Sequence, residues 1–477
     1  MADRPQPEPG PAAGASVPRE RRRSLWRHRD FMLLWTGQSV SEIGSAVTIV
    51  ALPFAAVVLL HATTFQVGLL TAAGTACFLL VALPAGLVVD RVAKRRLMIV
   101  CDASRTLILG SVVVAAALGM LTMAQLYVVA LLAGLATVFF DVAYQSYVPS
   151  LIAREQLHDG NGKLGATQAF SQVAGPGLGG ALFGLLKAGA LAADAISFAI
   201  STVTLLLIRA SEPRPARPAR DTGGASKTAA TRKNRLARKN RAAKPERAAR
   251  RNGLRDLRRE LFAGLAFVSK HPVLRKIAAC TGTANLFGAM SGALLIIFLV
   301  RLLAVSPQEA GLLFSIGSLG GIVGGVISGR LTRWIGSARI IWFSVGVFGL
   351  IPILLPLTEP GPRLVLFPIS LFGLTFVVVV YNIAQLSYRQ LITPPELLGR
   401  MNAAMRWIVW GTLPLGGLLG GVLGGALGVR PTLWIAVAGE WSAALWVFFS
   451  PLRRMRDIGD QAISLPADAG HEDLAKV

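Results

Sequence analysis

Three carboxylates, Glu42, Asp141 and Glu440, lie deep inside long apolar stretches of this chain. An ionisable side chain at membrane depth is costly, and it usually faces a cavity or a partner. A carboxyl group in apolar surroundings holds a proton more readily than one in water, which suits proton exchange near neutral pH. We therefore predict that Glu42 or Asp141 carries a coupled proton, with Glu440 as a third candidate. Each of them could instead be a hydrogen-bonded structural acid.

Amide side chains accompany two of these acids at helical spacing. Gln38 precedes Glu42 by four residues and Gln145 follows Asp141 by four, so each pair shares one helix face. Five further amides could line a cavity or equally bond neighbouring helices: Gln168, Gln172, Asn285, Asn382 and Gln385. Arg406 could meet an anionic substrate, although snorkelling to the membrane surface is the simpler expectation.

A charged turn follows one of the apolar stretches, reading Gly86-Leu-Val-Val-Asp90-Arg91-Val-Ala-Lys94-Arg95-Arg96. A carboxylate at the end of a helix can cap a neighbouring helix or pair with an arginine. Asp102 and Arg105, three residues apart on the next predicted helix, are candidate partners. We predict that this network makes and breaks contacts during gating. The alternative is a turn whose charges only set membrane orientation.

A weaker copy of this turn occurs later in the chain, as Gly325-Val-Ile-Ser-Gly329-Arg330. Gly329 stands 239 residues after Asp90 and replaces it, whereas Arg330 keeps the basic residue. The Tyr147 and Tyr388 segments, each followed by an asparagine, repeat at nearly the same shift. The repetition predicts two related halves, with the gating carboxylate only on the first.

A glycine-rich segment, Gly175-Pro176-Gly177-Leu-Gly179-Gly180, lies within another apolar stretch. Its spacing matches G-x-G-x-x-G, but a dinucleotide site needs a strand before the glycines and a helix that opens after them. Glycines inside a membrane helix instead allow neighbouring backbones to approach closely. We predict a helix-packing motif, kinked at Pro176 because proline removes one helical hydrogen bond.

The composition is that of a membrane protein. The 477 residues are 53% hydrophobic and 16% charged, whereas a soluble protein carries about 25% charged residues. The mean hydropathy is +0.56. A helix needs about 20 apolar residues to cross a bilayer. Twelve stretches meet this requirement: 30–60, 66–89, 97–120, 124–149, 164–187, 191–209, 272–303, 308–330, 338–358, 363–388, 403–427 and 431–452.

The net charge of +24 is concentrated at alternate ends of these stretches. Basic residues stay on the cytoplasmic side of a membrane. The connections on the opposite side contain only four of them, Lys187, Arg301, Arg363 and Arg430. Both termini are therefore expected in the cytoplasm of a cell whose plasma membrane holds the protein. This uneven distribution also argues against a nucleic-acid partner.

The spans divide the chain into an all-α membrane protein of two pseudo-symmetric six-helix bundles. The expected parts are a basic tail (1–29), an N-terminal bundle (30–209), a basic linker (210–270), a C-terminal bundle (271–454) and a tail (455–477). Leu254, Leu257, Leu261, Leu265 and Val268 recur at helical spacing, which predicts an amphipathic helix on the membrane surface at the end of the linker.

Neither an enzyme nor a cofactor is expected. Cys77, Cys101 and Cys280 have no disulfide or zinc-site spacing, and the five histidines form no metal-ligand or nucleophile–base pattern with them. Gly160-Asn-Gly-Lys163 lacks the first glycine and the hydroxyl of a phosphate-binding loop. We therefore expect no ATP-driven pump and no metal.

The motifs resemble those of the major facilitator superfamily. Gly86-x-x-x-Asp90-Arg91-x-x-x-Arg95-Arg96 is similar to its signature loop between the second and third helices. Gly175-Pro176-x-x-Gly179-Gly180 resembles its antiporter motif, although Ser171 stands where that motif usually begins with glycine. Ala143-Tyr144-Gln145 and His271-Pro272 resemble the branch with macrolide and multidrug efflux pumps and the enterobactin exporter.

This resemblance implies a monomeric secondary transporter that exports small amphipathic compounds in exchange for protons, with membrane lipids around it. Two alternatives stay open. One is an uptake permease or uniporter of the same superfamily. The other is a membrane sensor or scaffold that does not transport and uses the basic linker to bind a partner.

Overall fold

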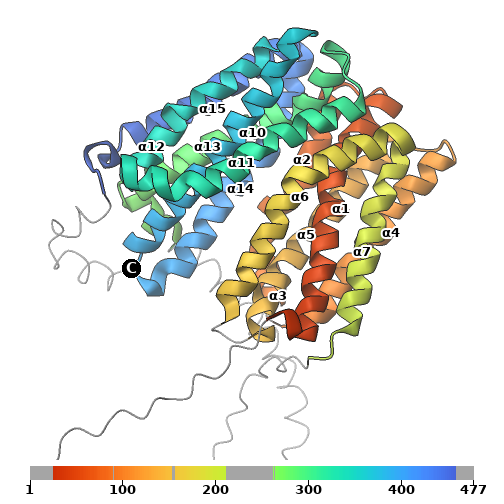
Figure 1. Ribbon diagram of the computed structural model, residues 1–477, viewed down its shortest axis with the longest axis horizontal. Coiled ribbons are helices and arrows are strands. Elements are labelled where there is room, and N and C mark those ends of the chain that lie inside the picture. The colour runs from red at the N-terminus through yellow and green to blue at the C-terminus, as the bar shows by residue number, and fades with distance from the viewer. Residues whose placement is uncertain (1–24, 90, 153–155, 211–261, 263, 458–477) are drawn as a thin grey trace, which may run out of the picture.

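A computed structural model describes residues 25–89, 91–152, 156–210, 262 and 264–457. These residues form helices joined by short turns, and Figure 1 shows the helices gathered into two groups, one from each half of the chain. Asp90, most of the predicted linker and most of both predicted tails lie outside the described residues. Of the predicted amphipathic helix, residues 262 and 264–270 are described. They are helical, and Val268 is buried in the core of the C-terminal group.

The N-terminal bundle contains six spans. They are α1 (Arg29–Phe54), α2 (Thr64–Leu80) continued by α3 (Ala82–Val89), α4 (Lys94–Ala117), α5 (Met123–Leu151), α6 (Leu157–Leu186) and α7 (Ala190–Leu207). Within this bundle α1 packs on α6 and α7, α4 packs on α5 and α7, and α2 packs on α5.

The C-terminal bundle repeats this arrangement. Its spans are α10 (Leu274–Ile297), α11 (Pro307–Ile335), α12 (Arg339–Gly346) continued by the 3₁₀ segment η7 (Phe348–Leu357), α13 (Leu366–Ile392), α14 (Pro395–Ala426) and α15 (Val429–Phe448). Here α10 packs on α14 and α15, α12 packs on α13 and α15, and α11 packs on α13. These pairs match those of the first bundle one for one, so the predicted pseudo-symmetry is confirmed.

Nine helical stretches in the described residues are long and apolar enough to cross a membrane, and one of them, Asp159–Leu207, contains both α6 and α7. The α2–α3 pair and α15 complete the predicted twelve spans. Two predicted spans are not continuous α-helices. The second is interrupted at Val81, and the ninth changes to 3₁₀ geometry at Phe348 because Pro352 and Pro356 lack the amide protons that an α-helix needs.

The first span of each bundle ends in a turn of the same form. Each span ends in a π-helical segment, Ala55–Leu59 or Phe298–Leu302. His61 (φ 50°) and Ala304 (φ 54°) then adopt the same left-handed conformation. Two residues after each of them, Thr63 and Ser306 form a capping box with the residue three positions further on. Both second spans therefore begin in the same way, which supports the pseudo-symmetry at the level of single residues.

Among the described residues, the two bundles share a buried apolar cluster only at this end. We call the end with these turns the far end, and the end with Lys94–Arg96 and Arg330 the basic end. At the far end, one apolar cluster contains Phe54 and Phe183 together with Phe298 and Phe367 of the other bundle. Towards the basic end the N-terminal and C-terminal bundles have separate buried clusters. The ribbons of the two bundles accordingly diverge towards that end in Figure 1.

Glycines bring the two bundles into backbone contact along two seams. At the α2–α14 seam, a Cβ atom on Gly68 would lie 2.5 Å from Gly421 Cα and 2.6 Å from Gly417 O. At the α6–α11 seam, a Cβ on Gly180 would lie 2.3 Å from Pro307 O and 2.7 Å from Gly311 Cα. Real Cβ contacts are not this short, so any larger residue must push the helices apart.

A hydrogen bond joins the bundles beside the seams. Arg301 Nη2, in the second π-helical segment, donates to the carbonyl oxygen of Ala62 in the turn of the first bundle at 2.6 Å. The residue at the matching place in the first turn is Val58, which cannot donate, so this link breaks the pseudo-symmetry.

We predict that Gly68→Ala opens the α2–α14 seam, whereas Gly74→Ala on the same helix does not, because a Cβ on Gly74 meets only Ala130 Cβ at 4.0 Å. The measurement is the rate at which a thiol reagent labels Thr64→Cys, next to Gly424 in this seam, in a background with Cys77, Cys101 and Cys280 replaced by alanine. Faster labelling in Gly68→Ala alone is expected. Equal rates in the two glycine variants would contradict the backbone contact.

Candidate functional site

Glu42 is the first acid of the candidate site, on the part of α1 between the basic end and the shared core. Gln38 Nε2 donates to Glu42 Oε1 at 2.9 Å, as their shared helix face predicts. Both side chains are half-buried. One turn away, Ser39 Oγ and Thr167 Oγ1 lie 3.1 Å apart and join α1 to α6. The site therefore begins on a helix that is fixed to its neighbour.

Asp141 on α5 lies within electrostatic reach of Glu42, and Arg105 on α4 and Arg406 on α14 act on it as positive charges. Tyr144, one turn along α5, is close enough to interact with both acids. Its hydroxyl has no hydrogen-bond partner among the described residues. We call Glu42, Asp141 and Tyr144 the acid cluster. It belongs to the N-terminal bundle, and the basic residue that acts on it, Arg406, belongs to the C-terminal bundle.

Arg406, the basic residue that acts on this cluster, makes a cation–π contact. Its guanidinium lies 5.0 Å from the centre of the Trp410 ring, and Trp410 meets Phe78 of α2 edge to face at 4.6 Å. The aromatic pair spans the two bundles, so Arg406 is placed next to the seam. Sequence reasoning favoured snorkelling for this residue, because the side chains facing it from the other bundle cannot be read from its own helix.

The remaining predicted amides divide into two groups. Asn285 donates to the carbonyl of Val409 at 3.0 Å, which joins α10 to α14. Gln385 is buried and accepts a hydrogen bond from Arg389 at 3.1 Å. The others are exposed on their helices: Gln145, Gln168, Gln172 and Asn382. Gln385 Nε2 also donates to Asn382 Oδ1 at 3.4 Å, so Asn382 shares this partner with the buried Arg389. By their exposure, all four of these exposed amides stay candidates for a cavity lining.

The predicted gating residues lie mainly at the basic end of the N-terminal bundle. Arg95 donates from Nε to Leu205 O and from Nη2 to Leu206 O, both at 2.7 Å, and so caps the last turn of α7. A cation at that position also suits the helix dipole. Arg91 and Arg330 are exposed, and a Cβ on Gly86 would meet nothing within 4 Å. The position of Asp90 relative to these arginines lies outside the described residues.

Asp102 and Arg105 form a buried ion pair with each other. Asp102 is fully buried, Ser201 Oγ of α7 donates to Asp102 Oδ2 at 2.6 Å, and the Arg105 guanidinium lies 4.1 Å from the Phe198 ring centre. This pair thus joins α4 to α7 within one bundle. In the C-terminal bundle, Arg389 plays a similar part, with Asn402 Oδ1 accepting its hydrogen bond at 2.6 Å.

The glycine-rich motif packs α6 against two different helices. A Cβ on Gly175 or Gly179 would run into Ala46 or Val47 of α1, and one on Gly177 or Gly180 into α11. The helix continues through Pro176. The motif thus fixes α6 to its own bundle on one side and to the other bundle on the opposite side.

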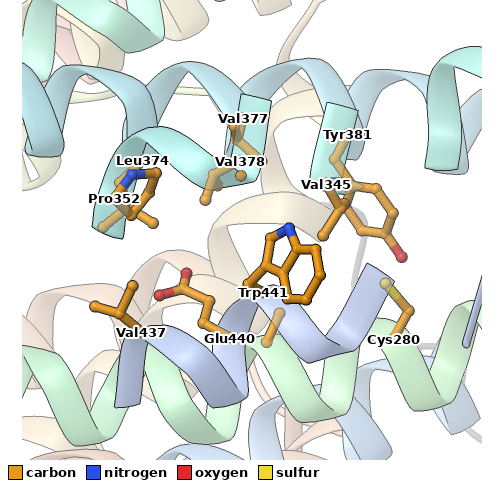
Figure 2. Close-up of a pocket in the computed structure, with 12 residues that line it drawn as sticks. Cys280, Val345, Pro352, Leu374, Val377, Val378, Tyr381, Val437, Glu440 and Trp441 are labelled. Carbon is orange, nitrogen blue, oxygen red and sulfur yellow. The ribbon is translucent and has the colours of Figure 1, made fainter. Parts of the chain in front are cut away.

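Glu440 lies apart from the acid cluster. It projects from α15 into an apolar pocket inside the C-terminal bundle, whose lining also includes Cys280, Tyr381 and Trp441 (Figure 2). The sequence identified the depth of Glu440 along its helix, but the direction of the side chain comes only from the packing of α10, α13 and η7 around α15.

Comparison with known proteins decides the family. The family model of the Major Facilitator Superfamily matches residues 34–412. This chain is a member of the Major Facilitator Superfamily. The multidrug efflux pump Tap of Mycolicibacterium fortuitum is 24% identical over 400 residues, which cover 82% of this chain and 88% of Tap.

The fold of this superfamily member is also that of solved transporters. The nucleoside transporter NupG has a TM-score of 0.65 at 14% identity, and the match covers 88% of this chain and 98% of NupG. A bacterial homologue of the iron transporter ferroportin, solved in an inward-facing state, has a TM-score of 0.65 at 16% identity, covering 89% and 98% of the two chains. The protein is therefore a multi-pass membrane transporter with the twelve-helix fold, and the resemblance seen in its motifs is confirmed.

We predict that Asp102→Asn lowers the stability of this transporter by about 3–5 kcal/mol, because it leaves the Arg105 guanidinium buried without its counter-charge. Ser201→Ala, which removes one hydrogen bond to a charged group, should cost about 1.5–3 kcal/mol. Asp159→Asn, on an exposed carboxylate, is the matched control. Thermal unfolding in detergent, followed by size-exclusion chromatography, measures all three. A stability of Asp102→Asn equal to that of Asp159→Asn would show that the pair is not structural.

Proposed function

We propose that this transporter exports small amphipathic compounds across the cytoplasmic membrane in exchange for protons. The acid cluster is the observation that carries the proposal, since two carboxylates on α1 and α5 share one region of the membrane interior. Their mutual repulsion is relieved when one of them binds a proton or when a cationic group enters. Competition between proton and substrate for these acids would couple the two fluxes.

The asymmetric closure of the bundles supports alternating access. The shared core and both glycine seams are at the far end, and the basic end has separate cores. The positive-inside rule favours a cytoplasmic position for the basic end and both termini. On that orientation the bundles have separate cores on the cytoplasmic side, from which an exporter loads its substrate. The similarity to a multidrug efflux pump supports export over uptake.

The acid cluster lies in the N-terminal bundle, and Arg406 of the C-terminal bundle acts on Asp141. Trp410 lies beside Arg406. A substrate between the acid cluster and these two side chains would meet carboxylates on one side and an aromatic surface on the other. Rocking of the bundles about the seams would then expose this region to each side in turn. The charged turn from Gly86 to Arg96, including Asp90, is proposed to hold one of the end states, with lipids bound around the bundles.

We predict that Asp141→Asn and Glu42→Gln each reduce proton-driven efflux by about tenfold or more, because an amide cannot exchange the proton that a membrane-embedded carboxyl exchanges. Glu359→Gln, an exposed carboxylate at the far end, is the matched control and should keep its rate. The assay is uncoupler-sensitive accumulation of a fluorescent amphipathic dye in inside-out vesicles or proteoliposomes.

Three outcomes would contradict the proposal. Full proton-driven efflux in both variants would remove the acid cluster from coupling. Transport by the unmodified protein that does not respond to an uncoupler would indicate a uniporter. A scaffold role would replace transport if two results occurred together: neither the unmodified protein nor any variant transports the dye, and deletion of residues 215–250 abolishes the biological function of the protein.

A further inference from the structure

Glu440 is a carboxylate at membrane depth that has no partner among the described residues. Neither a hydrogen bond nor an ion pair reaches it within that part of the chain, and no neighbouring charge acts on it. The other acids deep within the described spans each have a hydrogen-bond partner or a nearby positive charge: Asp102 with Arg105, Glu42 with Gln38, Asp194 with Ser197, and Asp141 near Arg406. Because an unpaired charge in this environment is costly, an acid without a partner indicates a group that is bound there.

Two cavities lie beside the Glu440 side chain. One has a volume of about 50 Å³ and the other about 110 Å³, and both are lined by Pro352, Leu374, Val437 and Glu440. Figure 2 shows the carboxylate pointing away from α15 toward the segments that carry Pro352 and Leu374. An apolar cavity of about 150 Å³ is known to hold benzene. The larger cavity is somewhat smaller, at about 110 Å³, so it suits an apolar group no larger than a phenyl ring.

The cavity walls offer few polar groups besides the carboxylate. Trp441 Nε1 already donates to Gly346 O at 3.0 Å, and the Tyr381 hydroxyl lies 2.8 Å from Thr281 Oγ1. These bonds fix both aromatic rings and leave mainly their apolar surfaces for a ligand. Ser291 Oγ, beside the larger cavity, is buried without a hydrogen-bond partner among the described residues. The pocket thus combines one carboxylate, aromatic surface and one available hydroxyl.

This combination selects one class of ligand. A carboxylate and aromatic rings favour a cation, and the apolar walls favour a hydrophobic body. A metal ion would need several oxygen ligands, which these walls do not supply. An anion would be repelled by Glu440, and a zwitterion would bury a second charge.

We propose that Glu440 and its two cavities bind a small organic monocation, an ammonium group attached to an apolar body of about phenyl size. The ammonium contacts the Glu440 carboxylate and Ser291 Oγ, and the body fills the space between α10, α13 and η7. All of these walls belong to the C-terminal bundle, so the site is separate from the acid cluster. This inference goes beyond the proposed function.

The test is calorimetric titration of the full-length protein in nanodiscs with benzylammonium, with benzyl alcohol as the neutral compound of the same shape. Saturable binding of benzylammonium is expected, and Glu440→Gln should weaken it by about tenfold or more, because a charge-assisted hydrogen bond is lost. Glu359→Gln, in the same bundle but exposed, should bind like the unmodified protein.

A second pair of variants keeps the test decisive if Glu440→Gln does not fold. Gly292 lines the larger cavity and a Cβ there would meet nothing within 4 Å, so we expect the longer side chain of Gly292→Leu to occupy the cavity. It should weaken binding, whereas Gly425→Leu, at an equally open position on α14, should not.

Four results would overturn the proposal: no saturable binding of benzylammonium, equal affinity in Glu440→Gln, equal affinity for benzyl alcohol, or unchanged binding in Gly292→Leu. Binding that is lost in Asp141→Asn but kept in Glu440→Gln would place the cation at the acid cluster instead, and would also contradict this site.

Discussion

Backbone contact between glycines of the two bundles is the constraint on which the rest of the structure depends. Gly68 against Gly421, and Gly180 against Gly311, allow the far end to close without side chains in between. The shared apolar core forms around these seams. Because there is no hydrophobic force between helices in lipid, close van der Waals packing must supply the contact energy. Two narrow seams, which can separate without unfolding either bundle, are therefore suited to an interface that has to open and close.

The buried acids differ in how completely they are paired, and we propose that the less completely paired ones are functional. Asp102 has an arginine, a hydroxyl and two aromatic rings around its ion pair, which joins α4, α5 and α7 within one bundle. Glu42, Asp141 and Glu440 are less completely paired. Burial of an ion without full compensation is expensive. Among the described residues, this free-energy cost is left uncompensated at two places, the acid cluster and the Glu440 pocket. A bound proton or ligand would lower the cost at either place.

The sequence predicted the fold class, the twelve spans and the family, because apolar length and motif spacing are local properties. It also identified the helix face that Gln38 and Glu42 share. It did not reveal the 3₁₀ geometry of η7, since an apolar run hides the effect of Pro352 and Pro356. The direction of Glu440, and the approach of Arg406 to Asp141, depend on the rotation of whole helices against each other. No spacing within one helix encodes that rotation.

Alternating access requires the bundles to close at one end when they separate at the other. Pulsed electron paramagnetic resonance on two spin-label pairs tests this most directly, with Met120 and Val365 labelled at the far end and Arg96 and Arg333 labelled at the basic end. Across a pH titration in nanodiscs, we expect the far-end distance to lengthen as the basic-end distance shortens, with both changes at the same midpoint. Two distances that change in the same sense, or a distance change at one end alone, would contradict alternating access.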